Sequence, residues 1–443
     1  MKRFLPEYIK TILSALTSAG YTAYVVGGCV RDMMMGRTPH DYDVCTSALP
    51  EQVKEVFKNE KVIETGIKHG TVTVVLGNDS CEITTYRVDG NYDDNRRPSS
   101  VKFVDNITED LSRRDFTINA MAYNPEVGLI DPFNGRTDLQ HNRIVCVGNP
   151  DERFKEDALR ILRALRFASV YNFRIDENTA LAIKNNKHLL TNISQERINS
   201  EFCKIIENAR LKLLNEFRDV FVVFIPEIEP MFGFNQNNPH HYLDVWQHTL
   251  SALDGAATED LITKLAVFFH DIAKPQTYTE DDNGIGHFYG HAGASAGVTE
   301  QILKRMRFDN DTIKKVSELI YYHSMELQES LRFTRRMINK LGVEQLNRLL
   351  TVNRCDKFAQ TKNKDSARTA YCVYAMRKNI KEILSLEQCT SLKDLAINGH
   401  DLIEVGFKEG REIGRVLNAL LERVIEDPNI NNYEALILLA KKV

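Results

Sequence analysis

The stretch that decides the fold reads Tyr24-Val-Val-Gly27-Gly28-Cys-Val-Arg31-Asp32, followed by Asp41-Tyr42-Asp43-Val44. In an extended strand, residues i and i+2 point to the same face, so Asp41 and Asp43 share one. Two carboxylates placed in this way can hold divalent metals roughly 4 Å apart, the arrangement used for in-line phosphoryl transfer. The spacing therefore predicts a metal site on one face of a strand.

The glycine pair before these carboxylates adds a second signal. Gly27-Gly28 follows an apolar run, and glycine lets backbone N–H groups approach phosphates closely. By itself a Gly-Gly pair is usually a turn, and an Asp-x-Asp pair is usually part of a surface strand. The two together, with Arg31 between them, favour chemistry on a nucleoside triphosphate.

Size and composition are those of a soluble globular protein. The chain has 443 residues, 43% of them hydrophobic and 27% charged, which suggests about three domains. Its eight cysteines form no C-x-x-C pair, so we expect reduced thiols, a cytoplasmic location and neither a zinc ribbon nor disulfides. We expect no signal peptide and no membrane span, because no apolar run approaches ~20 residues. A net charge of −4 neither demands nor excludes nucleic acid, so any RNA contact must come from local basic patches.

The hydrophobic patterns predict an α+β fold. Ile9, Ile12, Leu13 and Leu16 follow the spacing of an amphipathic helix within residues 1–20. Short β-rich runs then predict a small mixed sheet, at residues 21–26, 71–76, 81–86 and 144–147. After Asn149-Pro150 the segments have helical spacing to the end: 156–170, 177–190, 196–214, 245–257, 259–272, 293–307 and 311–323. We therefore predict that everything beyond the sheet is helical.

Glu82 is the third acidic candidate. It lies in the strand-like run Cys81-Glu-Ile-Thr-Thr-Tyr-Arg87, and a neighbouring strand could bring it beside Asp41 and Asp43. A third carboxylate there could activate the attacking hydroxyl or complete the metal coordination. The alternative is an ordinary exposed glutamate on a strand.

A dense polar block follows the predicted strands: Arg113-Arg114-Asp115-Phe-Thr-Ile-Asn119. Asp115 could cap the following turn. The arginines could hold a triphosphate or a ribose, since a guanidinium matches phosphate with two parallel hydrogen bonds. Capping and ligand binding are compatible here.

The predicted helix 156–170 carries Asp157, Arg160, Arg163 and Arg166 on one stripe. The simplest interpretation is an ion-paired solvent face. A sharper one is base selection, because a carboxylate only accepts hydrogen bonds and a guanidinium only donates them. Cytosine and adenine both offer an amino donor beside a ring-nitrogen acceptor, whereas uracil and guanine offer the reverse. An Asp157–Arg160 pair would accept CTP and ATP and reject UTP and GTP.

These blocks resemble the class II tRNA nucleotidyltransferases, the CCA-adding enzymes of the polymerase-β-like superfamily. The similarity covers roughly residues 20–210 and follows the family order, ending with Gln195-Glu196-Arg197-Ile-Asn199. It implies Mg²⁺ on Asp41 and Asp43, and tRNA, CTP and ATP as partners. The predicted nucleotide site comprises Gly27, Gly28, Arg31, Arg114, Asp115, Asp157, Arg160, Arg163 and Arg166.

Close relatives of this family leave alternatives open. Bacterial poly(A) polymerases share the blocks but typically carry an Arg-Arg-Phe run where this chain has Thr65-Gly-Ile-Lys-His-Gly-Thr71. CC-adding relatives lack the flexible-loop block, which residues 87–98 provide here. Full CCA addition is thus the favoured function, with polyadenylation as the alternative. His40 departs from the family, which usually has Lys before the first Asp.

A second constellation lies in the helical part: His248, His270-Asp271, His291, His323 and Asp356. Imidazoles and carboxylates on facing helices can hold one or two divalent metals for hydrolysis. A single buried histidine is usually a packing residue, but this ordered set resembles the HD metal-dependent phosphohydrolase domain. The resemblance implies a divalent transition metal and, as an alternative function, phosphohydrolysis.

The expected organisation has four parts. They are a nucleotidyltransferase head (1–148), a helical neck with the base-selection helix (149–225), an HD-type body (226–362) and an RNA-binding helical tail (363–443). Lysine and arginine cluster at 304–307, 314–315, 332–340 and 354–364, where they could follow the backbone of a tRNA acceptor arm.

Overall fold

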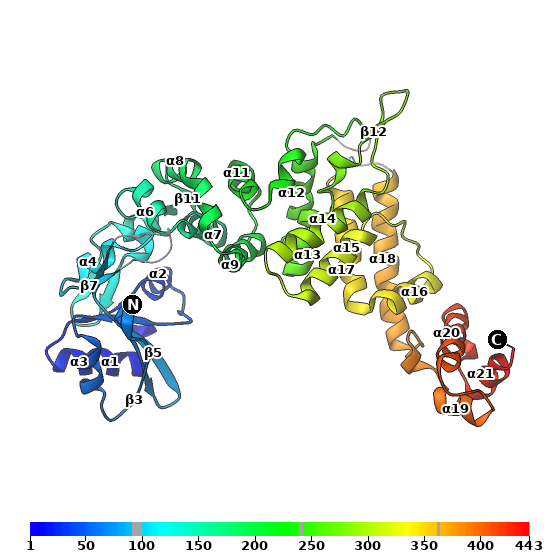
Figure 1. Ribbon diagram of the computed structural model, residues 1–443, viewed down its shortest axis with the longest axis horizontal. Coiled ribbons are helices and arrows are strands. Elements are labelled where there is room, and N and C mark those ends of the chain that lie inside the picture. The colour runs from blue at the N-terminus through cyan, green and yellow to red at the C-terminus, as the bar shows by residue number, and fades with distance from the viewer. Residues whose placement is uncertain (91–99, 239–241, 361–363, 443) are drawn as a thin grey trace. The chain divides into compact units, whose positions relative to one another are not determined.

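The computed structural model describes residues 1–90, 100–238, 242–360 and 364–442. The chain divides into two compact units, Met1–Pro226 and Glu227–Val443, each with its own internal packing (Figure 1). None of the described helices is both long and apolar enough to cross a membrane.

A seven-stranded mixed sheet forms the centre of the first unit, in the order β3-β4-β5-β2-β1-β8-β9. Its strands are β1 (Ala23–Val26), β2 (Asp43–Thr46), β3 (Lys61–Gly66), β4 (Thr71–Leu76), β5 (Asp79–Thr85), β8 (Ala122–Asn124) and β9 (Gly128–Ile130). Strands β2 and β5 run parallel, and every other neighbouring pair is antiparallel. The predicted α+β class with an N-terminal mixed sheet is confirmed.

Helix α1 (Glu7–Ser18) covers the sheet with the face that its sequence spacing predicts. Ile9, Ile12, Leu13 and Leu16 are all buried, in one core with Val25 of β1 and Val44 of β2. Burial of each such side chain contributes about 1.5–3 kcal/mol, which fixes the faces of β1 and β2 that point inward.

The register of the central strands sets the position of the acidic residues. Asp43 begins β2, opposite Val26, the last residue of β1, and opposite Glu82 on β5. Gly27 follows Val26 directly, and α2 (Gly28–Met34) begins after it. The glycine pair and Asp43 therefore lie at the same end of the neighbouring strands β1 and β2.

The first unit contains nine further α-helices among its described residues. They are α3 (Pro50–Val56), α4 (Ile107–Ser112), α5 (Gly135–Gln140), α6 (Pro150–Glu156), α7 (Leu159–Tyr171), α8 (Glu177–Asn186), α9 (Gln195–Glu207), α10 (Leu211–Glu216) and α11 (Arg218–Val222). Two short strand pairs join them: β6 (Arg87–Asp89) with β7 (Val101–Phe103), and β10 (Arg143–Ile144) with β11 (Arg174–Ile175). Strand β11 shows that the region after residue 149 is not purely helical, contrary to the prediction.

The predicted helix 156–170 is wrong at its start. Asp157 is extended, with φ −139° and ψ 101°, so α6 ends at Glu156 and α7 begins at Leu159. The Asp157 carboxylate accepts the Leu159 N–H at 3.1 Å, a local bond that competes with the helix and begins a new one. The break turns Asp157 away from the stripe that continuous helical spacing predicts.

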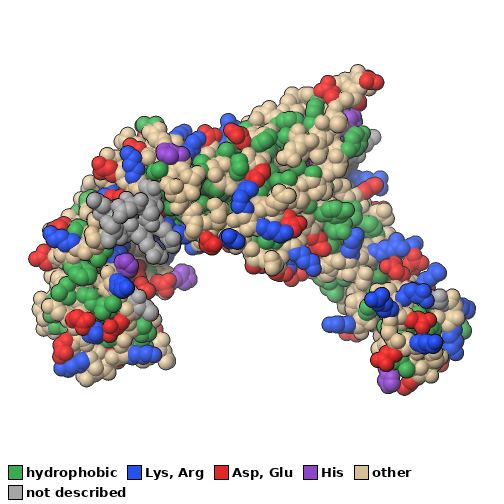
Figure 2. Space-filling view, viewed as in Figure 1, with side chains coloured by type: hydrophobic (Ala, Val, Ile, Leu, Met, Phe, Trp, Pro, Cys, Tyr) green, Lys and Arg blue, Asp and Glu red, His purple; other side chains and the backbone are tan. Residues whose placement is uncertain are grey.

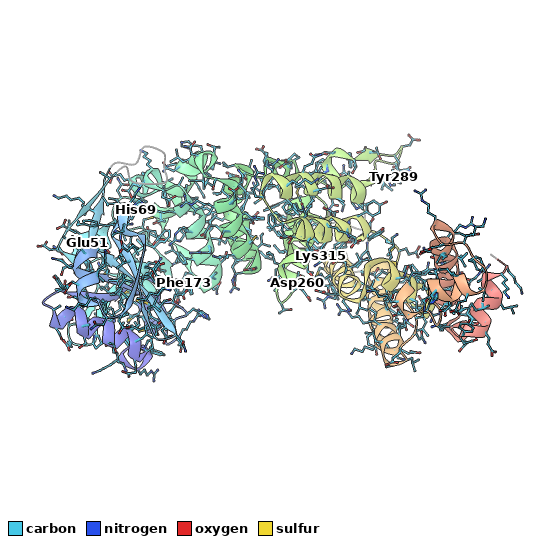
Figure 3. All side chains as sticks on the ribbon, turned by 60° about the horizontal axis from the view of Figure 1, so that its bottom comes forward. Glu51, His69, Phe173, Asp260, Tyr289 and Lys315 are labelled. Carbon is cyan, nitrogen blue, oxygen red and sulfur yellow. The ribbon has the colours of Figure 1, made fainter. Side chains whose placement is uncertain are left out.

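The second unit is a helical bundle followed by a small helical tail. Its helices are α12 (Val245–Gly255), α13 (Leu261–Phe269), α14 (His291–Arg305), α15 (Asn310–Tyr322), α16 (Leu331–Leu341), α17 (Val343–Phe358), α18 (Lys364–Ser385), α19 (Gly399–Glu404), α20 (Arg411–Glu426) and α21 (Tyr433–Ala440). Asp260, labelled in Figure 3, caps α13 and bonds Arg348 of α17 at 2.8 Å. Helices α12, α13, α15 and α17 pack against one another and form the core of this unit.

One hairpin interrupts the predicted all-helical body. Strands β12 (Thr279–Glu280) and β13 (Gly286–His287) pair across a turn in which Asp281 accepts the N–H groups of Asn283 and Ile285. The turn-forming residues Asp281-Asp-Asn-Gly284 account for it, because Gly284 adopts a positive φ.

Candidate functional site

One cavity of about 670 Å³ in the first unit gathers most of the residues selected from sequence. The lining includes Gly27, Gly28, Arg31, Asp41, Asp43, Arg114, Asp115, Asp157, Arg160, Arg163 and Arg166. We call this space the arginine cavity. Five further lining residues lie outside the predicted nucleotide site: Arg113, Asn119, Leu159, Phe167 and Arg197. Of these, Arg113 and Asn119 belong to the polar block, and Arg113 is one of the two arginines expected there to hold a triphosphate or a ribose. Arg197 belongs to the block Gln195-Glu196-Arg197-Ile-Asn199, and its place in that family block is the sequence signal that points to it.

Glu82 lies beside this cavity rather than in its lining. Its strand β5 runs parallel to β2 and pairs it with Asp43, so both side chains leave the same face of the sheet. Its side chain is exposed. The neighbouring-strand position agrees with the expectation from sequence, and its catalytic role stays a prediction.

Gly27 has to be glycine at its position. Its φ is 75°, and an added Cβ would lie only 2.7 Å from Nη1 of Arg114. Its N–H donates to the carbonyl of Met121 on the way into β8 at 3.2 Å, which fixes the turn. A side chain here would both strain the backbone and push Arg114 out of place.

Arg31 is buried and held on several sides. Its Nη1 donates to Oδ1 of Asn119 at 2.6 Å, and its Nη2 lies 2.9 Å from Oδ1 of Asp32. The guanidinium carbon stands 4.8 Å from the ring centre of Tyr171 and 5.3 Å from that of Phe167. Because Tyr171 and Phe167 lie on α7, these contacts join α2 to α7. Such cation–π contacts are stronger when they are shielded from water, as they are for the buried Arg31.

Asp115 links the polar block to α7. Its Oδ1 accepts the Phe116 N–H at 2.8 Å and the Asn119 amide at 3.1 Å, and its Oδ2 lies 2.6 Å from Nη2 of Arg163. Burial alone would raise the pKa of this carboxyl, but Arg163 and the hydrogen bond from Asn119 outweigh it and lower the pKa to about 2. The expectation that Asp115 caps the following turn is wrong, because the short helix Thr117–Asn119 begins after Phe116 and has no side-chain cap; Asp115 instead forms an ion pair with Arg163.

Asp157 and Arg160 both line the cavity, but each has other partners. Oδ2 of Asp157 accepts from Nη2 of Arg197 on α9 at 2.9 Å. Arg160 is held by Glu156 at 2.6 Å and by the carbonyl oxygens of Arg153 and Arg113. Asp157 is thus ion-paired with Arg197 and Arg160 with Glu156, and the predicted reading of the base by Asp157 and Arg160 stays a prediction.

Some buried donors of this cavity have no partner among the described residues. They are Nε of Arg114 and Nη1 of Arg197. A buried donor that stays unsatisfied costs about 1–3 kcal/mol. Since both side chains line the cavity, a ligand with acceptor atoms would satisfy them.

The carboxylates at the mouth fit a divalent cation. Partial burial, together with the neighbouring charge of Asp41, raises the pKa of Asp43, whereas Arg114 opposes the rise. A cation relieves such repulsion, and carboxylate oxygens are the ligands that Mg²⁺ prefers. The other element predicted at this site, the loop 87–98, lies largely outside the described residues; only Arg87–Gly90 is described, with β6 (Arg87–Asp89).

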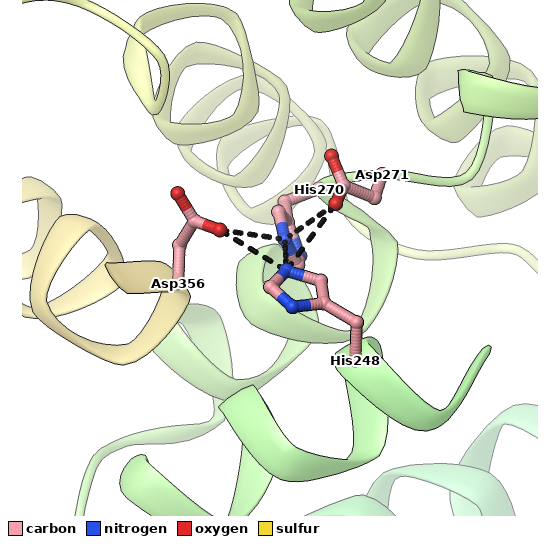
Figure 4. Close-up of side chains that lie close together, drawn as sticks. All are labelled: His248, His270, Asp271 and Asp356. Carbon is pink, nitrogen blue, oxygen red and sulfur yellow. Dashed lines mark hydrogen bonds and ion pairs between the residues drawn. The ribbon is translucent and has the colours of Figure 1, made fainter. Parts of the chain in front are cut away.

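The second unit brings all six residues of the other constellation together, and we call them the histidine cluster. Figure 4 draws four of them: His248, His270, Asp271 and Asp356. His248 of α12 has its Nε2 3.0 Å from Asp356, 3.4 Å from Asp271 and 3.3 Å from Nε2 of His270. On the other side of Asp271, the Nε2 atoms of His291 and His323 lie 3.3 Å apart and 3.7 Å from Oδ1 of Asp271. Asp271 belongs to both groups, so it could bridge two ions.

The histidine rings are oriented for metal ligation. Nδ1 of each ring lies near a backbone carbonyl: Val267 for His270, Phe288 for His291, Ile320 for His323 and, at 3.4 Å, Ala359 for His248. A proton on Nδ1 leaves the Nε2 lone pair pointing into the cluster. Two such lone pairs 3.3 Å apart need a proton or a cation between them.

The charges of the histidine cluster set its proton balance. Burial alone would lower the pKa of His270, but Asp271 and Asp356 raise it to about 10. Burial lowers the pKa values of His248 and His291. Without a metal, protonated His270 and Lys274, whose Nζ is 2.7 Å from Asp271, therefore balance the two carboxylates. A metal would displace the His270 proton.

Comparison with known proteins places both units in one family. Three family models match: the Poly A polymerase head domain (residues 23–145), the probable RNA and SrmB-binding site of polymerase A (172–230) and the putative tRNA nucleotidyltransferase domain 2 (279–440). A CCA-adding enzyme of Lactobacillus helveticus is 35% identical over 98% of this chain and 96% of its own length. One from Lactococcus lactis subsp. cremoris is 32% identical, over 100% of this chain and 98% of its own length.

Solved structures agree with this assignment. The Bacillus stearothermophilus CCA-adding enzyme in complex with CTP has a TM-score of 0.70 and 28% identity, over 98% of this chain and 96% of that one. The Thermotoga maritima CCA-adding enzyme complexed with tRNA_CCA has the same fold, with a TM-score of 0.61, 21% identity and coverage of 98% and 94%.

The low pKa of Asp115 predicts an acid-sensitive ion pair. Because the folded pKa lies below the unfolded value of about 3.9, the stabilisation is full above pH 4 and is lost as pH falls towards 2. Asp115→Asn should lower the free energy of unfolding of the first unit by about 2 kcal/mol at pH 7, and by much less near pH 2. Urea unfolding followed by circular dichroism measures this. An equal loss at both pH values would contradict the ion pair.

The histidine cluster should bind a divalent transition metal. Trp246, the only tryptophan, is buried two residues before His248, so its fluorescence reports unfolding of the second unit. Co²⁺ at a hundredfold excess over its Kd should stabilise that unit by about 2.7 kcal/mol. The apparent affinity should rise from about pH 6 to 9, as the metal displaces the His270 proton. Asp271→Ala should abolish the effect, and Asp254→Ala, an exposed change on α12, should not. No response to Co²⁺ in the parent would reduce the cluster to packing residues.

Proposed function

This chain belongs to the CCA-adding enzyme family, and on that basis we propose that it adds CCA to the 3′ end of tRNA from CTP and ATP without a template. The observation that carries the proposal is the arginine cavity, which is lined by Asp43 of β2, by Asp41 just before this strand and by polar side chains of α2, α7 and α9. The identity of the relatives favours CCA addition over polyadenylation.

The residues of this cavity divide the work of nucleotidyl transfer. The 3′-hydroxyl oxygen of the tRNA attacks the α-phosphorus, and the bond to the β-phosphate breaks to release pyrophosphate. Asp41 and Asp43 would hold Mg²⁺, which supplies positive charge to the triphosphate when bound. Arg114, with its Nε unpaired among the described residues, is placed beside Gly27 to bind phosphate oxygens. Glu82 stands next to Asp43 as the candidate base for the attacking hydroxyl.

Selection of the base falls to the Asp157 region. The Asp157 carboxylate can accept a hydrogen bond from the amino group that cytosine and adenine share and that uracil lacks. Nη1 of Arg197, without a hydrogen-bond partner among the described residues, can donate to the neighbouring ring nitrogen. Arg160 has carbonyl partners on two sides, so Arg197 joins it as the candidate donor.

The surface of the second unit is suited to hold RNA. Lysine and arginine side chains are spread over its visible face, interspersed with acidic ones (Figure 2). Such a surface binds phosphates along a folded RNA by charge and shape rather than by sequence. The clusters at 304–307, 314–315, 332–340 and 354–364 are the proposed contacts, and residues 361–363 of the last cluster lie outside the described residues.

A second function is favoured by the histidine cluster: metal-dependent phosphohydrolysis. In this reaction a water oxygen attacks the phosphorus, and the ester bond breaks as the alcohol leaves with a proton. The four imidazoles and two carboxylates would hold the metal, which activates the water when bound. Phenyl phosphate hydrolysis by the Co²⁺-loaded protein tests it, and Asp271→Ala should remove the activity while tRNA extension continues.

The main proposal is tested by the length of the product. A tRNA transcript that lacks its CCA end should gain CC with CTP alone and CCA with both CTP and ATP. Asp41→Ala and Asp43→Ala should lower the rate of nucleotide addition roughly a thousandfold or more, because the variants would no longer hold the Mg²⁺ that stabilises the negative charge of the triphosphate. Both side chains are exposed, so the fold should persist. Asp79→Ala, an exposed change on β5, is the control. A long A tail made from ATP alone would contradict CCA addition.

Asp157 should control which triphosphates are accepted. Asp157→Ala removes the acceptor, and Arg197→Met removes the donor that also holds Asp157. Each change should cost roughly 1–3 kcal/mol of discrimination against UTP and GTP. Glu152→Ala, an exposed acid on α6, should leave discrimination unchanged. The measurement is the ratio of kcat/KM values for the four triphosphates. Parent-like ratios in both variants would reduce Asp157 to a structural residue.

A further inference from the structure

A second cavity, of about 260 Å³, lies on the flank of the histidine cluster. We call it the Lys357 cavity. His323 belongs both to its lining and to the histidine cluster. Two other lining residues, Asn353 and Lys357, stand on α17 close to Asp356. The cavity is therefore next to the candidate metal ligands. His323 is one of these ligands and Lys357 falls in the basic cluster 354–364, but no motif and no proposed tRNA contact accounts for the other lining residues.

The lining of this cavity has an excess of positive charge. Lys357 and Arg368 are its cations, and Glu326 is its only carboxylate among the described lining residues. Ser324 and Thr369 add hydroxyl groups that can donate hydrogen bonds. This combination is suited to an oxyanion, because ammonium, guanidinium and hydroxyl groups all donate to phosphate oxygens.

Both cations can turn to a ligand at little cost. Arg368 reaches Glu326 only at 3.6 Å, and both side chains are mostly exposed, so this ion pair is weak. Nζ of Lys357 lies 3.1 Å from Oε1 of Gln360 and 3.8 Å from Asp356. A metal on Asp356 would take up the charge of that carboxylate and leave Lys357 to another anion.

Size narrows the ligand. A volume of about 260 Å³ lies just below the roughly 300–1,000 Å³ of pockets for drug-sized ligands. The space suits a phosphate group with one sugar or ring and excludes a duplex end.

We propose that the Lys357 cavity is the anion subsite of the histidine cluster, and that it holds the phosphate of a small phosphomonoester of about the size of a nucleoside monophosphate. The inference rests on the proposed phosphohydrolase site. Lys357 and Arg368 bind the phosphate oxygens and position the phosphorus beside His323. They are positioning residues for a ligand that the metal-loaded cluster receives.

The test is calorimetric binding of phenyl phosphate to the full-length protein loaded with Co²⁺. Lys357→Gln and Arg368→Gln should each weaken binding about tenfold, the scale of one charge-assisted hydrogen bond. Their Co²⁺ content, by elemental analysis, should equal that of the parent. Lys378→Gln, an exposed change further along α18, should bind like the parent. Phenyl phosphate bound in the arginine cavity would be the same in all variants and appear as a constant background.

The outcomes separate the subsite from the chemistry. Parent-like binding in both Gln variants, an equal loss in Lys378→Gln, or absence of binding to the parent overturns the subsite. Loss of Co²⁺ from both Gln variants also overturns it, since the two residues would then support the cluster itself. Binding that depends on Lys357 and Arg368 without hydrolysis supports the subsite and rejects the phosphohydrolase function.

Discussion

The structure of the first unit depends on one constraint, the repulsion among seven arginines that line a single cavity. Each guanidinium group needs a nearby negative charge, because without one the arginines would repel one another and leave the cavity. Carboxylates provide these charges: Asp32 for Arg31, Asp110 for Arg113 and, at 3.7 Å, for Arg114, Glu156 for Arg160, Asp115 for Arg163, Glu201 for Arg166 and Asp157 for Arg197. The cavity is thus organised before any ligand enters, which is the condition for a protein to act as its own template.

The second unit also depends on balancing like charges, but there the charges are negative. In the histidine cluster two buried carboxylates need positive charge, and a proton, a lysine or a metal can provide it. Each candidate site belongs to one compact unit and has its own ligand set. Nucleotidyl transfer and the proposed hydrolysis are therefore expected to tolerate separate substitution.

Much of this could be predicted from sequence, because hydrophobic spacing and residue type carry it. The spacing of α1 and the run at β4 predicted their elements, and chemical type together with the family resemblances selected most of the lining of the arginine cavity and the histidine cluster. The prediction that Asp157 is helical was wrong, because its carboxylate accepts the Leu159 N–H and this local bond outweighs the helical spacing of the sequence. The ion pair of Asp157 with Arg197 could not be predicted from sequence either, because α9 comes close to Asp157 only in the folded chain. The hairpin β12–β13 was missed because its strands are too short to show a pattern.

The central claim is that the protein, without a nucleic-acid template, distinguishes the bases. It is tested most directly by the equilibrium affinities of CTP, ATP, UTP and GTP for the full-length protein with Mg²⁺ and no RNA. The account predicts that CTP and ATP bind at least about tenfold more tightly than UTP and GTP, a difference of about 1.4 kcal/mol. Equal affinities for all four triphosphates would contradict it.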